Sequence, residues 1–160
     1  MINRLSQNES FSNAIWKIAI GSALSWEISQ LLGSKHPYLA PLSVILCIQA
    51  TTDKTLSIAV QRIIGTIIGI PIVVVIAKHL SITGWNLGIL ILLGGYISKW
   101  LKLDQHILHQ IAITILFVFV FEKQTKHYAI DRLNDTLVGV LVAVLLQYIW
   151  LKLQGKQIIS

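Results

Sequence analysis

Residues 55–78 read TLSIAVQRIIGTIIGIPIVVVIAK and decide the class of fold. A helix that crosses a bilayer needs about 20 mostly apolar residues, and this stretch carries only Arg62 before its terminal lysine. Pro71 removes a backbone donor and clashes with the preceding turn, so it predicts a kink or a break. The stretch therefore predicts a transmembrane helix that contains both a charge and a proline.

Five further apolar stretches surround this one. A polar lead-in at 1–12 comes first, and a short tail at 154–160 comes last. Aromatic residues near most of the expected ends fit the bilayer interface, which favours amphipathic rings. The sequence thus predicts an all-α integral membrane protein with six transmembrane helices within residues 13–153. The six expected spans are 13–32, 36–50, 55–78, 85–100, 105–121 and 128–152.

The composition agrees with lipid as the solvent. Hydrophobic residues make up 54 % of the 160 residues and charged residues 12 %, about half the usual charged share of a soluble protein. The net charge of +6 is scattered between the spans without a basic stripe. This distribution excludes nucleic acid as the expected partner and favours contact with membrane lipid.

The distribution of cations also predicts an orientation. An even number of spans places both termini on one side. With a cytoplasmic N-terminus, eight Lys and Arg residues fall inside and five outside, which favours cytoplasmic termini. We therefore expect a multi-pass membrane protein with both termini on the cytoplasmic side. The inner set is Arg4, Lys17, Lys54, Arg62, Lys99, Lys102, Lys152 and Lys156; the outer set is Lys35, Lys78, Lys123, Lys126 and Arg132.

Two segments share one pattern. Residues 62–69 read RIIGTIIG and residues 132–139 read RLNDTLVG, so both follow R-x-x-[GD]-T-x-x-G. We interpret them as an internal repeat with halves at about 13–80 and 84–153. Three spans in each half would force opposite orientations, a recurrent plan of transporters in which the substrate site lies near the repeat interface.

The sequence also resembles a known membrane module. The resemblance rests on His36-Pro37-Tyr38-x-Ala40, on Gln49-x-Thr51 and on the two arginine motifs. The module is that of the bacterial aromatic acid exporter family, related to fusaric acid resistance proteins (the FUSC group) and, remotely, to plant aluminium-activated malate transporters. It covers about 14–151 and implies a six-helix domain that moves or conducts organic anions.

One departure from that family affects the expected partners. Members usually carry a cytoplasmic domain after the last helix, whereas only residues 153–160 follow it here. We therefore expect the chain to work as a homo-oligomer, most simply a dimer, or with a partner protein.

Arg62 and Arg132 are the first candidate substrate-binding residues. A charge at the bilayer centre is costly, and the planar guanidinium binds carboxylate through two hydrogen bonds. Thr66 and Thr136, one turn further along each helix, could line the same anion path. The alternatives are that the arginines extend to lipid headgroups or that they pair with nearby acids such as Asp135.

Other polar residues in the spans have two interpretations each. Glu27, the most central acid, and Asp135 could couple transport to protons or form structural ion pairs. Lys17 is expected to extend to the interface. Small residues are expected to be packing devices, because they let helices approach closely in lipid. These are Ser22, Ser25, Ser29 and Gly33 on one helix face, and the pairs Gly65 with Gly69 and Gly84 with Gly88.

No enzyme motif is present, and we expect no cofactor and no metal. His106 and His109 lie three residues apart, but no further ligand of matching type accompanies them. The predicted function is export of organic, aromatic in particular, carboxylate anions. A non-transporting dimeric scaffold for a partner protein and a passive anion channel are the alternatives.

Overall fold

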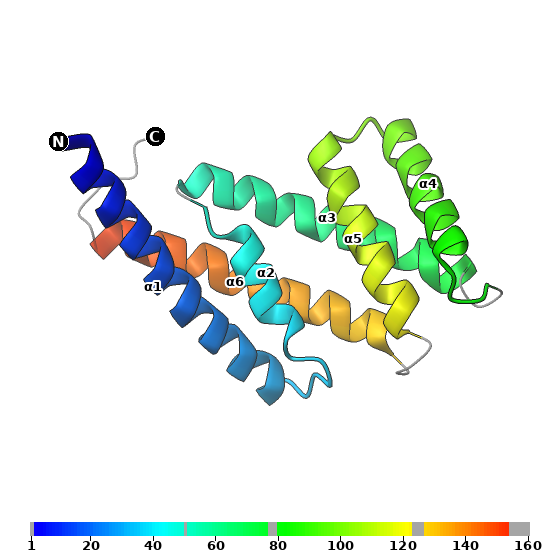
Figure 1. Ribbon diagram of the computed structural model, residues 1–160. Coiled ribbons are helices and arrows are strands. Elements are labelled where there is room, and N and C mark those ends of the chain that lie inside the picture. Colours follow the sequence, from blue (N-terminus) through cyan, green and yellow to red (C-terminus); the bar gives the residue numbers. More distant parts are fainter. Residues whose placement is uncertain (1, 50, 77–79, 123–126, 154–160) are drawn as a thin grey trace. The chain divides into compact units, whose positions relative to one another are not determined.

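The computed structural model describes residues 2–49, 51–76, 80–122 and 127–153, with side chains from Ser12 onward, and no strand occurs in these ranges. Within these ranges six helices follow one another (Figure 1). The all-α prediction is therefore confirmed for this part of the chain. The helices are α1 (Ile2–Leu31), α2 (Leu39–Cys47), α3 (Thr52–Ile76), α4 (Gly84–Trp100), α5 (Gln105–Phe121) and α6 (Tyr128–Leu153).

Three of the predicted spans coincide closely with helices. Helix α5 has the predicted bounds, and α4 and α6 differ from prediction by one residue at one end. Helix α1 ends beside Gly33, as predicted, although it already begins at Ile2 within the expected lead-in. The expected tail and most of the charged loop before α6 lie outside the described residues.

Helix α2 is much shorter than its predicted span of 36–50. Its nine residues make about 14 Å of helix, roughly half the thickness of a hydrocarbon core. The helix ends because the backbone becomes extended at Ile48, with φ −66° and ψ 119°. The Gln49 N–H then donates to Thr55 Oγ1 at 3.1 Å, which ties the segment to the first turns of α3. The predicted end at Ala50 lies outside the described residues.

Pro71 does not break α3. The helix continues through it to Ile76, so the predicted break is wrong. The ring lies exposed, whereas the next residues, Ile72 and Val73, are buried. An outward-facing proline costs the helix one hydrogen bond but need not disturb the packed side. The predicted end of the span at Lys78 lies outside the described residues.

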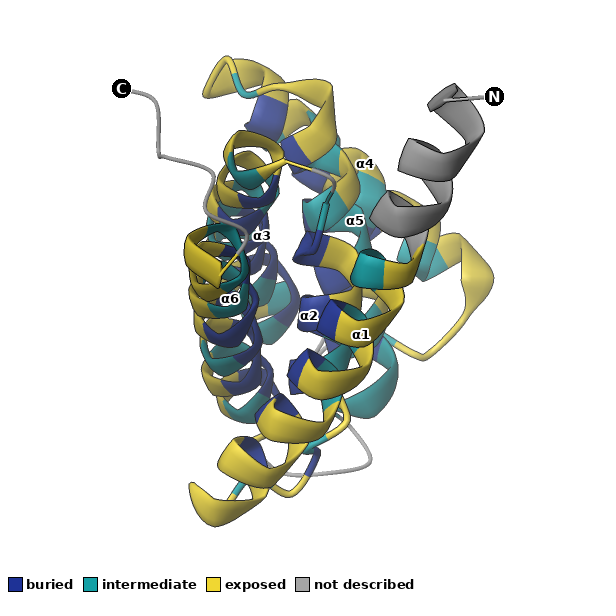
Figure 2. Cartoon of the chain, turned by 90° about the vertical axis from the view of Figure 1, so that its left-hand side faces the viewer, coloured by how far each residue is buried: buried dark blue, intermediate teal, exposed yellow. Residues whose placement is uncertain are grey.

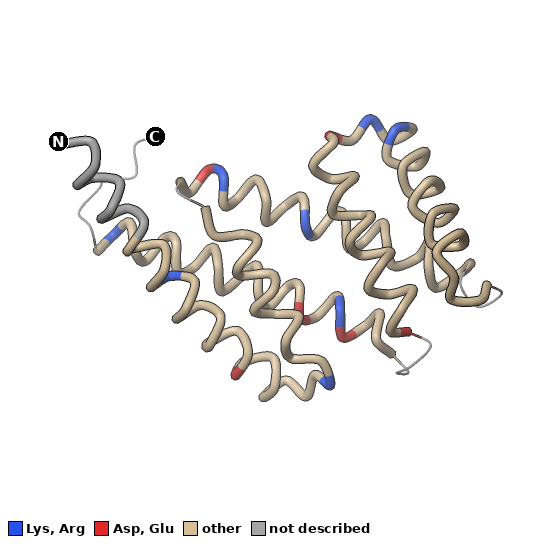
Figure 3. The backbone as a smooth tube through the Cα atoms, in the orientation of Figure 1, with Lys and Arg blue, Asp and Glu red and all other residues tan. Residues whose placement is uncertain are grey.

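Two described helices, α3 and α6, are long and apolar enough to cross a bilayer, and α5 is a shorter apolar helix. Figure 2 shows exposed residues along the helices, and many of them are large hydrophobic residues. Trp85 and Trp100, at the two ends of α4, are 88 % and 82 % exposed. Such surfaces suit lipid better than water, and few charged residues lie along the helices (Figure 3). Six separate crossings remain an expectation.

The helices group into two compact units that differ from the predicted halves. Unit 1 is Met1–Ala59 with Asp135–Ser160, and unit 2 is Val60–Asn134. Unit 1 therefore holds α1, α2 and most of α6, and unit 2 holds α4, α5 and most of α3. Each unit combines two helices of one predicted half with the long helix of the other half.

Small residues bring the helices of unit 1 close together. A Cβ added to Gly139 of α6 would lie 2.5 Å from the Cβ of Ser43 in α2. A Cβ added to Gly21 of α1 would lie 2.8 Å from side-chain atoms of Val44 and Leu146. Neither position has room for a larger residue, so glycine allows α1, α2 and α6 to pack.

In unit 2 the glycines of α3 have the same role. An added Cβ at Gly65 would lie 2.5 Å from Gln110 Cβ, and one at Gly69 would lie 2.9 Å from Thr114 Cβ, both in α5. The packing prediction is therefore confirmed for this pair. For Gly84 and Gly88 in α4 it is not, since no described atom lies within 4 Å of an added Cβ.

Candidate functional site

Arg62 is buried in unit 2 and contacts α5. Its side chain is 1 % exposed, and its Nη1 donates to Gln110 Oε1 at 3.1 Å. Gly65, one turn further along α3, packs on the stem of the same glutamine. Burial contradicts the alternative that this arginine extends to the lipid headgroups. The amide oxygen instead fixes one edge of the guanidinium.

Arg132, in the first turns of α6, also contacts α5 within unit 2. It is 1 % exposed, and its Cζ lies 4.7 Å from the centroid of the Phe117 ring. A guanidinium in this position is attracted by the negative face of the ring. Phe117 stacks on Phe121 with centroids 6.2 Å apart, and Phe121 packs against Tyr128 at 5.2 Å. This arginine does not extend to the headgroups either.

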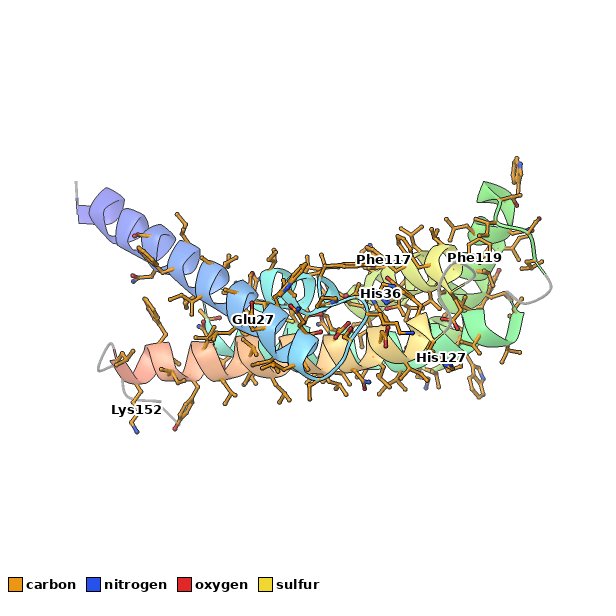
Figure 4. The ribbon with its side chains drawn as sticks, turned by 90° about the horizontal axis from the view of Figure 1, so that it is seen from below. Glu27, His36, Phe117, Phe119, His127 and Lys152 are labelled. Atoms are coloured by element: carbon orange, nitrogen blue, oxygen red, sulfur yellow. The ribbon has the colours of Figure 1, made fainter. Side chains whose placement is uncertain are left out.

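The partners of the two arginines lie on one stripe of α5. Gln110 and Phe117 are seven residues apart, which is close to two helical turns and about 10 Å along the axis. Thr114, buried against Gly69, lies between them on the same face. Figure 4 marks Phe117 and the buried Phe119 on this helix. Unit 2 thus presents two buried guanidinium groups to a single helix face.

Thr66 and Thr136 are both buried, at 2 % and 1 % exposure. Thr66 belongs to unit 2 with Arg62 and Arg132, whereas Thr136 belongs to unit 1. Of the four predicted substrate-binding residues, three therefore share one compact unit.

Asp135 is held by two serine hydroxyls within unit 1. Ser29 donates to Oδ1, and Ser34 donates to Oδ2 at 2.7 Å. The carboxylate is 1 % exposed. The Ser34 Oγ also accepts the backbone N–H of His36 at 3.1 Å, so the loop after α1 is tied to the same group.

The end of α1 places Ser34 in this position. Gly33 has a φ of +83°, which costs glycine little. The Gly33 N–H donates to the Gln30 carbonyl at 3.0 Å, and the Ser34 N–H donates to the Ser29 carbonyl at 3.1 Å. These two bonds form a Schellman cap, which terminates the helix and fixes the residue that follows the glycine.

Lys17 does not extend to the interface as predicted. It is 7 % exposed, and its Nζ donates to Gln147 Oε1 at 3.0 Å. Together with the bond between Ser29 and Asp135, this contact makes α1 and α6 antiparallel neighbours, with their buried residues on facing sides (Figure 2). Four buried residues at four-residue spacing from each helix line the seam: Lys17, Gly21, Ser25 and Ser29 from α1, and Asp135, Gly139, Ala143 and Gln147 from α6.

Glu27 and the two histidines of α5 are exposed. No hydrogen bond or ion pair joins Glu27 to another described residue, and Figure 4 marks it on α1. His106 and His109 are exposed, whereas His36 is buried edge-on against Tyr38, with ring centroids 5.9 Å apart. In the part of the chain that the structure describes, no three His, Cys, Asp or Glu residues are grouped to hold a metal ion.

The family model described as fusaric acid resistance protein-like matches residues 24–146. The chain belongs to the fusaric acid resistance protein-like family. The resemblance predicted from the two arginine motifs is thereby confirmed. Searches of curated proteins and of solved structures found no match. Family membership and the exposed apolar helices together indicate a membrane protein that acts in transport or resistance.

The range matched by the family model includes some polar contacts of this fusaric acid resistance protein-like chain and leaves out another. It includes Arg62, Arg132 and Asp135 with their described partners. Lys17 and Gln147, at the far end of the seam between α1 and α6, lie just outside it. The arginine and aspartate contacts therefore lie within the part of the chain that the family model covers, whereas the contact between Lys17 and Gln147 does not.

Several of these partners were not predicted from the sequence of this family member. Gln110 and Gln147 are polar residues inside otherwise apolar helices. A polar side chain in such a position usually has a buried partner, so the sequence could have indicated both. Ser34 follows a glycine at a helix end, which could have indicated the cap. Phe117 carried no signal, because one phenylalanine in an apolar helix is indistinguishable from a lipid-facing one.

Proposed function

We propose that this chain exports organic carboxylate anions, aromatic ones in particular, across the bacterial cytoplasmic membrane. The observation that supports the proposal is the pair of buried guanidinium groups, Arg62 and Arg132, on one face of α5. A buried cation is costly to keep in a membrane protein, and such residues usually mark an ion or substrate path.

The chemistry of this face suits an aromatic carboxylate. Arginine stays charged and can bind a carboxylate with two parallel hydrogen bonds. Phe117 and Phe121 supply aromatic surface next to Arg132, so an anion with an apolar ring would find both a cation and a stacking partner. Thr66 would add a hydroxyl within the same unit.

Repeated contacts support the proposal that the two halves are inverted repeats. Gly69 packs on Ile111 and Thr114 of α5, and Gly139 packs in the same way on Ala40 and Ser43 of α2. In both cases the glycine meets a backbone carbonyl and the residue three positions later. Under this proposal Thr136 is the counterpart of Thr66 and lines the second half of the path.

The test is flux of labelled aromatic carboxylates into proteoliposomes, with leak into protein-free liposomes subtracted. Phthalate is the informative substrate, because this dianion crosses pure lipid poorly near neutral pH. Arg62→Gln and Arg132→Gln should each abolish protein-dependent uptake. Lys54→Gln, an exposed cation in the first turn of α3, is the matched control and should leave uptake intact. Normal uptake by both folded arginine variants would refute the anion path.

The alternatives give different results in the same preparation. A passive channel would show unitary current steps in planar bilayers, whereas a carrier would not. A scaffold would show no protein-dependent flux of any anion, together with a tightly bound partner. We expect saturable flux without unitary steps, and a dimer by light scattering in detergent.

We also propose that both termini are cytoplasmic, on a charge count that takes burial into account. Lys17, Arg62 and Arg132 are buried, so they do not act as interfacial charges in the positive-inside comparison. Removing them from the two sets of eight and five leaves six inner cations against four outer ones. The sign of the bias is unchanged. Accessibility of a terminal cysteine tag to an impermeant thiol reagent in intact cells would test it.

A further inference from the structure

We propose that Asp135, with Ser29 and Ser34, is the proton-binding site that couples anion export to the proton gradient. The proposal rests on the proposed export function, because it needs a transported anion. The sequence left this role open to both Glu27 and Asp135, and we assign it to Asp135. Glu27 lies exposed on α1, whereas Asp135 is 1 % exposed and held by two hydroxyls.

The geometry selects a proton over a metal ion. The Ser34 Oγ lies 2.7 Å from Asp135 Oδ2, and the Ser29 Oγ is in direct hydrogen-bond contact with Oδ1. A metal cation takes several oxygen ligands, and among the described residues no three His, Cys, Asp or Glu side chains are grouped to supply them. A proton needs no such set of ligands.

The bound proton has an acceptor already in place. It would bond to Oδ2, converting the carboxylate to a carboxylic acid that donates to Ser34 Oγ. A hydroxyl oxygen has two lone pairs, and one is used by the His36 N–H at 3.1 Å. The second lone pair is then available once the Ser34 hydroxyl hydrogen has turned away from Asp135. The proton comes from a hydronium ion of the surrounding water, so one O–H bond breaks there, leaving water, as the O–H bond on Oδ2 forms.

The loop after α1 gives the proton a way in. Ser34 is half-buried, and its neighbours Gly33 and Lys35 are exposed. The hydroxyl therefore joins an exposed loop to a buried carboxylate. The C-terminal end of α1 lies at the same place and carries the negative end of the helix dipole, which favours a positive charge.

Other ionisable groups lie on the same loop and helices or precede Asp135 in the sequence. Lys35 and buried His36 are on the loop, Glu27 and Lys17 are on α1, buried Cys47 is on α2, and Asp131 and Arg132 precede Asp135 on α6. His36 reaches the cluster through its backbone N–H. Asp135 is the buried carboxylate of unit 1 that the two serine hydroxyls contact directly.

The first test compares two phthalate assays in one set of proteoliposomes. Exchange across the membrane without a gradient reports the anion path, and accumulation driven by an imposed pH gradient reports coupling. For Asp135→Asn we expect exchange to persist, while accumulation falls to simple equilibration. Gradient-driven accumulation equal to that of the unmodified protein would overturn the proposal.

The same two assays on the unmodified protein distinguish failure of the proton site from failure of anion transport. Exchange that ignores the pH gradient would overturn the proton site and leave anion transport standing. Absence of exchange would overturn anion transport and the coupling together.

A second variant covers the case in which Asp135→Asn does not fold. Ser34→Ala keeps the Asp135 carboxylate but removes one of the hydroxyl groups that donate to it. Because that hydrogen bond stabilises the ionised form, Asp135 should keep its proton to higher pH in the variant. We expect the pH midpoint of accumulation to move to higher pH. Ser25→Ala is the control, because that hydroxyl donates to the Ser22 carbonyl within α1. A midpoint that Ser34→Ala leaves in place would overturn the proposal.

Discussion

The guanidinium of Arg62 and the side-chain amide of Gln110 meet at 3.1 Å, although 48 residues separate them in the sequence. The contact joins α3 to α5 inside unit 2 and gives a buried cation a fixed acceptor. A buried charge that loses a hydrogen-bond partner costs more than the bond itself contributes, because the charge remains out of water. Three further contacts lead to predictions of the same kind: Gly69 with Thr114, Lys17 with Gln147, and Arg132 with Phe117.

Gln110→Leu should lower the free energy of unfolding by about 1–3 kcal/mol, because Arg62 stays buried without its amide acceptor. The measurement is denaturant unfolding in detergent micelles, followed by circular dichroism. Gln105→Leu is the control, since Gln105 is exposed at the start of α5 and should shift stability by at most about 0.5 kcal/mol. Equal effects of the two substitutions would contradict the role given to the amide.

Gly69→Ala should destabilise the protein by about 1–3 kcal/mol, because its new Cβ would lie 2.9 Å from Thr114 Cβ. Gly139→Ala should act in the same direction against Ser43. Gly88→Ala should instead be neutral or stabilise α4 by up to about 1 kcal/mol, since no described atom lies near it and alanine favours a helix. Thermal unfolding of all three variants in one detergent checks the order. A destabilising Gly88→Ala would show that α4 has a close neighbour after all.

Lys17→Met and Gln147→Leu should each destabilise the protein more than the double variant does. Each single change leaves one buried polar group without the partner that it has at 3.0 Å, whereas the double change removes both. We expect a coupling energy of about 1–3 kcal/mol in the double-mutant cycle. Additive effects would mean that the contact between α1 and α6 contributes no pairwise stability.

Phe117→Leu should cost about 0.5–2 kcal/mol beyond its own loss of buried area, whereas Phe119→Leu should cost only its loss of buried area. Both residues are in α5, but Arg132 Cζ lies over the ring of Phe117. Phe117→Tyr keeps the ring face and should retain most of that difference. The readouts are the free energy of unfolding and the KM for phthalate, which should rise for Phe117→Leu if this ring also contacts substrate. Equal losses at the two positions would remove the cation–π contribution.

Part of this architecture follows from local sequence alone. Helices α4, α5 and α6 have nearly the predicted bounds because long apolar runs and the turns between them are local signals. The end of α1 at Gly33 follows for the same reason, since only a glycine readily takes the positive φ of a Schellman cap. The shortness of α2 and the continuation of α3 through Pro71 did not follow, because both depend on what packs around those residues.

The sequence by itself determined the helical class, the apolar surface, the family and the identity of the two unusual arginines. It determined them because hydrophobic periodicity, length and a repeated motif are properties of a single chain segment. Only the tertiary structure decided that Lys17, Arg62 and Arg132 are buried, that Asp135 meets two serines, and that each compact unit takes its long helix from the other predicted half. The physical reason is that a charged group in an apolar helix can be satisfied by lipid headgroups or by a distant polar side chain, and that choice is made by packing between segments far apart in the chain.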